Sequence, residues 1–182
     1  LNVDFEVVIM LTNEEKIKQI EVNVKEIMNI LGIDITEGNF ETPKRVAKMY
    51  VNEIFDSLHK EEPENIKVFS SEGASAEVKV NVPFSSVCEH HWLPFFGNVT
   101  ITYKPNDKVL GLSKFARIVK FVAKKPQLQE RLTKEIADLV FKYTEPEYVK
   151  VEVEAEHTCV RCRGVEVPCN TKTEYELYED EV

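Results

Sequence analysis

The chain has 182 residues, and its 32 acidic and 23 basic side chains give a formal net charge of −9. This balance excludes a general nucleic-acid binder, which needs a basic face, although a local cluster of Arg and Lys can still bind an anionic small molecule. Four cysteines are too few for a disulfide scaffold, and no segment reaches the length of a membrane span, so we expect a cytoplasmic protein in a reducing compartment.

Apolar residues recur at helical spacing near the N-terminus and predict a helix over residues 14–31. Thr12 or Asn13 is the expected N-cap of this helix, because their side-chain oxygens can accept from free backbone N–H groups. Gly32 is the expected end, since glycine readily adopts the left-handed conformation that terminates helices.

A second helix is predicted from Thr42 to about residue 58, because Pro43 suits a first helical turn. Residues 60–75 are charged and then contain Ser and Gly, which is typical of a connector. We therefore expect an N-terminal helical region with its connector over residues 1–75 and a ββααββ domain over residues 76–182. Met10 precedes the first helical pattern, so residues 1–9 are expected to be foreign to the native chain or disordered.

Alternation of apolar and polar residues begins at Glu77 and marks the first of four predicted strands. Ser113 is the expected cap of the first helix that follows them, and Pro126 the expected start of the next. In chain order, the predicted elements are strands at 77–84 and about 99–103, helices at 114–124 and 126–143, and strands at 149–157 and 168–178. This order predicts an α+β fold, with an antiparallel sheet covered on one face by a helix pair.

Two short clusters, residues 86–92 and 156–164, hold three of the four histidines together with cysteines. Thiolate and imidazole are ligands that Zn²⁺ prefers, and Cys88 and His91 lie at ligand-like spacing. Cys159 supplies a third ligand from the second cluster if the fold brings the clusters together. A catalytic zinc has three protein ligands and an open position, whereas Cys162 as a fourth ligand would make a closed structural site. Spacing alone leaves both readings open.

Several motifs in the same order resemble the GTP cyclohydrolase I family over about residues 14–165. They are Thr42-Pro43-Lys44-Arg45-Val46-Ala47-Lys48-Met49-Tyr50, Cys88-Glu89-His90-His91, Gly111-Leu112-Ser113-Lys114, Gln127-Leu128-Gln129-Glu130-Arg131-Leu132, and His157-Thr158-Cys159 with Arg163-Gly164. The tail from Val165 to Asn170 and the nearby Cys162 depart from the family pattern. These departures leave the motif set intact.

The resemblance implies a tunnelling fold in which ββααββ subunits join into a β-barrel ring, with two pentameric rings stacked into a decamer. It implies one Zn²⁺ per subunit and the conversion of GTP and water to 7,8-dihydroneopterin triphosphate and formate. Neither nucleic acid nor membrane is an expected partner. A related tunnelling-fold enzyme acting on a pterin or deazapurine, and a non-catalytic zinc-stabilised assembly module, are the alternatives.

The resemblance also implies a role for each matched residue. The zinc ligands are Cys88, His91 and Cys159, and the histidines placed to donate and accept protons are His90 and His157. The residue that binds the guanine edge is Glu130, with Gln129 beside it. The residues that line the ribose and triphosphate pocket, some of them across a subunit boundary, are Ser113, Lys114, Arg117, Arg163 and Arg45.

Overall fold

The structure is a computed structural model that describes residues 11–181. The expectation for residues 1–9 lies outside this range. The chain divides into two compact units, residues 1–59 and 60–182. The expected domain organisation, with a boundary between residues 75 and 76, stays a prediction. Among the described residues, no helix combines the length and apolar character needed to cross a bilayer.

Helix α2 (Asn13–Ile30) opens the described part of the first unit. Its N-cap is Thr12, whose hydroxyl accepts from the Glu15 N–H at 3.3 Å while the Glu15 carboxylate accepts from the Thr12 N–H at 2.8 Å. This reciprocal capping box satisfies two backbone donors, so the sequence predicted the start of the helix correctly. Gly32 has a φ of +69° directly after the Leu31 C-cap, which confirms the predicted end.

Helix α3 (Thr42–Met49) passes into a π-helical turn (Tyr50–Ile54) instead of continuing to residue 58. The Phe55 N–H donates to the Tyr50 carbonyl at 3.0 Å, the i to i+5 bond that defines a π turn. The same turn stacks the two rings, with centroids 5.5 Å apart. The predicted helix is therefore too long, since the α-helix ends at Met49 and the π turn ends at Ile54.

The second unit is built on a five-stranded sheet in the order β5-β2-β3-β6-β7. Its strands are β2 (Val78–Cys88), β3 (Pro94–Lys104), β5 (Pro126–Gln127), β6 (Tyr148–His157) and β7 (Asn170–Tyr178). The four long strands pair antiparallel, and only the short β5 runs parallel to its neighbour β2. A separate pair, β1 (Val68–Ser70) with β4 (Lys108–Leu110), lies beyond the main sheet.

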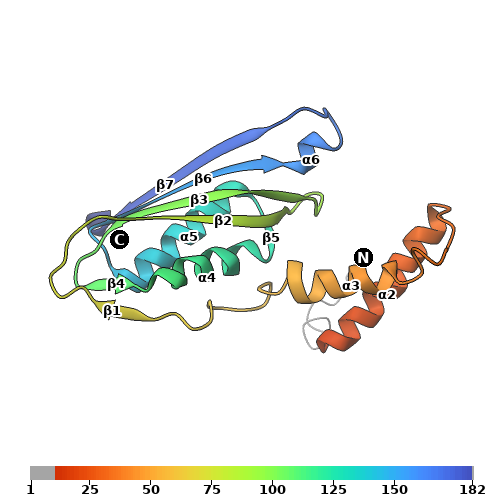
Figure 1. Cartoon of the computed structure of the whole chain (residues 1–182), viewed down its shortest axis with the longest axis horizontal. Helices are drawn as coiled ribbons and strands as arrows, with labels where there is room; N and C mark the ends of the chain where they lie inside the picture. The colour runs from red at the N-terminus through yellow and green to blue at the C-terminus, as the bar shows by residue number, and fades with distance from the viewer. Residues whose placement is uncertain (1–10, 182) are drawn as a thin grey trace. The chain divides into compact units, whose positions relative to one another are not determined.

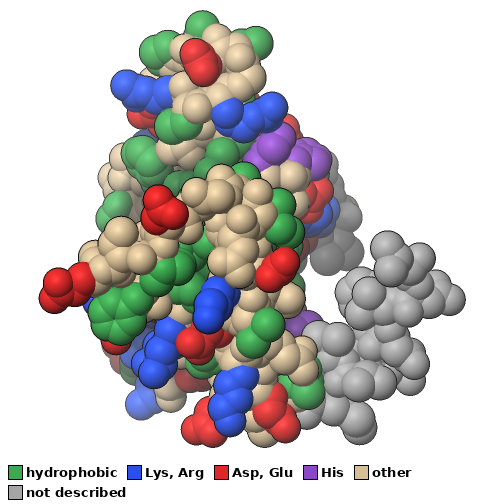
Figure 2. Space-filling view, turned by 90° about the vertical axis from the view of Figure 1, so that its right-hand side faces the viewer, with side chains coloured by type: hydrophobic (Ala, Val, Ile, Leu, Met, Phe, Trp, Pro, Cys, Tyr) green, Lys and Arg blue, Asp and Glu red, His purple; other side chains and the backbone are tan. Residues whose placement is uncertain are grey.

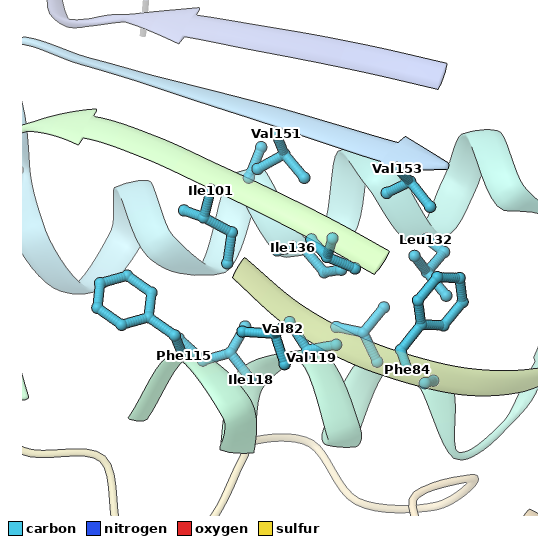
Figure 3. Packing of buried hydrophobic residues seen from close by; sticks show 14 of the residues in the cluster. Val82, Phe84, Ile101, Phe115, Ile118, Val119, Leu132, Ile136, Val151 and Val153 are labelled. Atoms are coloured by element: carbon cyan, nitrogen blue, oxygen red, sulfur yellow. The ribbon is translucent and has the colours of Figure 1, made fainter. Parts of the chain in front are cut away.

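Helices α4 (Leu112–Ala123) and α5 (Gln129–Thr144) cover one face of the sheet (Figure 1). Inward-facing strand residues meet apolar helix residues in one core, where Val82, Ile101 and Val151 lie opposite Phe115, Ile118 and Ile136 (Figure 3). Burial of such side chains stabilises by roughly 1.5–3 kcal/mol each. The α+β architecture with a helix pair on one face is thus confirmed, and it agrees with the tunnelling fold that the resemblance implies.

Three further local predictions were wrong for identifiable reasons. Helix α5 begins at Gln129 and not at Pro126, because Pro126 and Gln127 form β5 against the end of β2. Gly111 is the N-cap of α4 and makes no side-chain capping bond, so Ser113 falls inside the first turn. The predicted connector contains β1, whose three residues are too few to show alternation.

Candidate active site

Cys88 is the last residue of β2 and begins a tight turn into β3. The Cys88 N–H donates to the Leu93 carbonyl at 2.9 Å, and the Trp92 N–H donates to the Cys88 carbonyl at 2.8 Å. Trp92 adopts a φ of +53°, the left-handed conformation that lets a chain reverse this sharply. The turn holds His90 and His91 beside the Cys88 sulfur.

Cys159 reaches the same place from β6 and the short helix α6 (Thr158–Arg161). The β3–β6 register places Phe95 opposite His157, and the Thr158 hydroxyl donates to the Pro94 carbonyl. Strand β3 therefore lies between β2, which leads into the turn, and β6, which leads into α6. This pairing brings together two cysteines that are distant in sequence.

The ligand atoms of Cys88, His91 and Cys159 all lie within 4.8 Å of one another. The Cys88 sulfur is 3.8 Å from Nδ1 of His91 and 3.8 Å from Nδ1 of His90. Two sulfurs and one imidazole nitrogen suit Zn²⁺, and three protein ligands leave a fourth position for water. Without a metal, burial raises the pKa of the Cys159 thiol, and its hydrogen bond with Cys88 adds to this shift.

Cys162 is exposed at the end of α6. It does not belong to the metal-ligand group found among residues 11–181, which comprises Cys88, His91 and Cys159. The geometry thus favours an open three-ligand site over the closed four-ligand alternative.

His157 lies two residues before Cys159, with its ring stacked on the buried Phe95 at a centroid distance of 4.8 Å and an interplanar angle of 3°. Its Nε2 is 2.7 Å from Oε1 of Gln129. Burial lowers the pKa of His157, while the negative charge of Glu130 acts in the opposite direction. Glu130 follows Gln129 on α5, and Gln129 contacts His157, so Glu130 belongs to the same part of the structure.

Helix α5 begins with two predicted site residues that have opposite environments. Gln129 is 2% exposed, whereas Glu130 is exposed in the first helical turn. An acidic side chain in the first turn interacts favourably with the helix dipole. Glu130 is therefore free to meet a ligand from solution, and Gln129 is directed into the protein.

Arg131 is a structural partner that the sequence analysis did not single out. Its guanidinium forms an ion pair with Glu89 and donates to the Gln127 side chain at 2.9 Å and to the Pro126 carbonyl at 3.0 Å. The Glu89 N–H donates to the Gln127 carbonyl at 3.0 Å. Arg131 thus fastens the turn that carries His90 and His91 to the start of α5. The i, i+4 spacing of Gln127 and Arg131 was the available sequence signal.

The predicted anion-binding residues are spread more widely. Arg163 lies beside the metal-ligand group, with its Nη1 2.7 Å from Nε2 of His91. Arg45 lies in the first unit, where it forms an exposed ion pair with Glu41 at 2.6 Å. Figure 2 shows His side chains at the surface beside Lys and Arg side chains. His90 and His91 are both exposed.

Ser113, Lys114 and Arg117 lie in the N-terminal half of α4, away from the metal-ligand group. The other end of α4 is next to that group, because the Ala123 carbonyl accepts from the Ser86 hydroxyl at 2.8 Å. A helix rises about 1.5 Å per residue, so Ser113 and Lys114 start roughly 14 Å from that end. Within a single chain, Ser113 and Lys114 therefore do not lie next to Cys88.

Comparison with known proteins gives a consistent result. The family model described as GTP cyclohydrolase I matches residues 20–179. The chain is 46% identical over 158 residues to GTP cyclohydrolase 1 of Clostridium perfringens (strain 13 / Type A), covering 86% of this chain and 83% of that protein. It is 48% identical over 157 residues to GTP cyclohydrolase 1 of Hydrogenobaculum sp. (strain Y04AAS1), covering 85% and 83%.

Among solved structures, the archaeosine synthase QueF-Like in its apo form covers 56% of this chain and 94% of its own, with a TM-score of 0.42 and 21% identity. A likeness at this level does not bear on the function of the chain.

Proposed function

Because the chain belongs to the GTP cyclohydrolase I family, we propose that it hydrolyses GTP at C8 and forms formate and 7,8-dihydroneopterin triphosphate. The observation that carries this proposal is the grouping of Cys88, His91 and Cys159 within 4.8 Å. Around this group lie two further histidines, an exposed carboxylate and an arginine. These are the groups that ring opening of a guanine nucleotide needs.

Cys88, His91 and Cys159 would hold one Zn²⁺ per chain, since their donor atoms and spacing suit this ion. When bound, zinc supplies an activated water near neutral pH, because it lowers the pKa of its water ligand to about 7. The two cysteines of the group are buried, whereas His91 is exposed to solvent, so GTP can approach the group from the side of His91. Free thiols persist in a reducing compartment, which supports a cytoplasmic location.

Glu130 would select guanine. Its carboxylate can accept two hydrogen bonds, from the guanine N1–H and from the exocyclic N2–H₂. Adenine does not present two donors in this arrangement, so it would leave a carboxylate oxygen unpaired. The exposure of Glu130 at the start of α5, close enough to His157 to affect its pKa, supports this role.

His90 and His157 would transfer protons. C8 of guanine is a weak electrophile, and protonation of N7 makes it more reactive toward water. Imidazole titrates near neutral pH and can donate that proton and accept others as the five-membered ring opens and formate leaves. Two histidines beside one ligand group allow successive proton transfers without a single residue serving every step.

The triphosphate would be held by Arg163 and Arg45 together with Lys114, Arg117 and Ser113. Arginine offers a bidentate fork that matches phosphate oxygens. Since Ser113 and Lys114 lie far along α4 from the metal-ligand group of their own chain, we propose that a neighbouring subunit supplies them. The assembly would be the decamer of two stacked pentamers that the family resemblance implies.

Product analysis tests the proposal directly. Zinc-loaded protein incubated with GTP should release formate and, after oxidation, yield a fluorescent pterin. ATP should give neither product, because it lacks the donors that Glu130 requires. A zinc-loaded protein of native fold that releases no formate from GTP would refute the proposed function.

A further inference from the structure

Gln129 is almost fully buried, and both ends of its side-chain amide have partners inside the protein. The residue is 2% exposed. Its Nε2 has three acceptors within hydrogen-bond distance, the Val153 carbonyl at 3.1 Å, the Thr171 carbonyl at 3.0 Å and the Thr173 hydroxyl at 3.2 Å. Its Oε1 lies 2.7 Å from Nε2 of His157.

These partners fix which way the amide points. Backbone carbonyl oxygens only accept hydrogen bonds, so the NH₂ group must face Val153 and Thr171. The reversed amide would place Oε1 against two other oxygens and leave all three without a proton between them. Gln129 Oε1 therefore faces His157, and the orientation follows from the chemistry of its neighbours.

The amide orientation decides the tautomer of His157. An amide oxygen cannot donate, so the 2.7 Å contact requires a proton on Nε2 of His157. In the neutral ring the lone pair then lies on Nδ1. Stacking on Phe95, at an interplanar angle of 3°, holds the plane of the ring as well.

We propose that Gln129 is a positioning residue that holds His157 in the Nε2–H tautomer and leaves Nδ1 to exchange protons with the substrate. The proposal deepens and rests on the proposed function, in which His157 transfers protons. It replaces the expectation that the Gln129 side chain binds the guanine edge, because both ends of this buried amide are occupied inside the protein.

Two adjacent residues in the first turn of α5 would thus have different roles, one inside the protein and one toward the substrate. Successive residues on a helix point about 100° apart, so a buried Gln129 leaves Glu130 directed outward. The Gln129 amide donates to backbone carbonyls of β6 and β7, and these bonds fix the oxygen that contacts His157. Glu130 is left to bind the base. A single helix start would then align the proton-transfer group with the recognition group.

Solid-state ¹⁵N NMR of histidine-labelled protein tests the tautomer at a pH where His157 is neutral. The wild-type spectrum should show a protonated Nε2 and a bare Nδ1 for His157, identified by the signal missing from His157→Phe. A protonated Nδ1 with a bare Nε2 would overturn the proposal. This readout needs no turnover, so it stands apart from the proposed function, which fails instead if the wild type releases no formate from GTP.

Kinetics of Gln129→Met separate positioning from substrate contact. If Gln129 positions His157, kcat should fall about tenfold or more, as expected for impaired proton transfer, while KM stays within about twofold. The His157 signals should also shift toward a mixture of tautomers. A raised KM with kcat and the His157 spectrum unchanged would show that Gln129 binds substrate, and the proposal would be wrong.

Thr173→Val is the matched control. It removes one acceptor from the Gln129 amide but keeps both carbonyls, so Oε1 should stay on His157. The His157 spectrum and kcat should match the wild type. A loss of the tautomer in Thr173→Val, with the fold intact, would show that the two carbonyls do not set the orientation of Gln129 and would contradict the argument.

Discussion

Cys88 and Cys159 are buried, but His91 is exposed, so the metal-ligand group lies at a boundary between core and solvent. A thiol at such a place can have a structural or a chemical role. The distinction rests on Cys162, which is exposed and separate from the group. An open site needs Cys159 and can dispense with Cys162, whereas a closed site needs both.

We expect Cys159→Ser to lose zinc and all measurable turnover, because a soft thiolate ligand is replaced by a hydroxyl. Cys162→Ser should retain about one zinc per chain and most of the activity. Zinc content by mass spectrometry and formate release measure the two effects. If Cys162→Ser also lost its zinc, the closed structural site would be correct and the proposed chemistry would have no open position.

Glu130→Gln should weaken the binding of GTP while zinc stays bound. The substitution keeps the size of the side chain but replaces one accepting oxygen by a donor. A hydrogen bond to a charged group is worth about 1.5–3 kcal/mol, so KM or Kd should rise roughly ten- to a hundredfold. Asp138→Asn is the control, since Asp138 pairs with Lys134 further along the same helix. Normal GTP affinity of Glu130→Gln would remove this residue from the site.

At the level of elements, the turn after β2 depends on a helix that follows it by some forty residues. Arg131 reaches Glu89, Gln127 and Pro126 from the first turns of α5. Gln127 is 1% exposed and donates to the Val122 carbonyl at 3.0 Å and to Glu135 at 3.0 Å. Buried polar networks of this kind hold one geometry, because each unpaired member would be costly.

We predict that Arg131→Met lowers the affinity for zinc by about tenfold, since loss of the residues that orient metal ligands commonly costs 10- to 100-fold. The methionine keeps much of the side-chain length but cannot pair with Glu89. Competition with a chromophoric chelator measures the affinity. Lys134→Met on the same helix is the control and should match the wild type. Equal affinities in the two variants would show that Arg131 does not support the ligand turn.

The pairing of β3 with β6 depends on a residue without a side chain. A Cβ at Gly97 would lie 1.9 Å from the Glu154 carbonyl oxygen and 2.7 Å from Cα of Ala155. Both obstacles are backbone, so they cannot rotate away. The pair formed by Phe95 and His157 lies two positions from this point along the same two strands.

Gly97→Ala should therefore force the strands apart and destabilise the second unit. Overpacking a well-filled site costs about 1–3 kcal/mol, and a clash with backbone belongs at the upper end. Chemical denaturation measures the free energy of unfolding. Gly38→Ala is the control, because its Cβ would meet only the Thr36 hydroxyl at 3.7 Å. An equal stability of Gly97→Ala and the wild type would show that β3 and β6 adjust without cost.

At the scale of the whole molecule, local sequence signals predicted most of the fold but not the contacts between distant segments. Thr12, Gly32 and the alternation after Glu77 acted through neighbours in sequence, and the corresponding elements are present. Strand β5 was missed because two residues carry no periodicity, and its pairing with Cys88 is a tertiary contact.

The candidate site follows the same pattern. Residue types and spacing indicated Cys88 and His91, but only the β3–β6 register explains why Cys159 joins them. The burial of Gln129 had no signal in the sequence, since its partners Val153 and Thr171 belong to strands that are distant from it in sequence. The motif alone therefore suggested a substrate contact for a side chain that faces inward.

The two edges of the main sheet lead to the last prediction, which concerns assembly. Strand β7 is the outermost strand on one side, and on the other side β5 pairs only with Val87 and Cys88 at the end of β2. Most of β2 thus has one unpaired side within the described chain, and long exposed edges tend to pair with another strand. A ring of subunits would pair each β2 with a neighbouring β7.

We predict a homo-oligomer, the decamer, whose zinc content is independent of assembly but whose activity depends on it. Cys88, His91 and Cys159 come from one chain, whereas Lys114 lies at the far end of α4 and would serve a neighbour. Dissociated subunits should therefore retain zinc and lose turnover, as light scattering combined with metal analysis can measure. Inactive Cys159→Ser and Lys114→Ala chains, refolded together, should regain activity, because some interfaces then combine an intact metal-ligand group with an intact Lys114. A fully active monomer, or mixed oligomers with no more activity than either variant alone, would contradict the shared site.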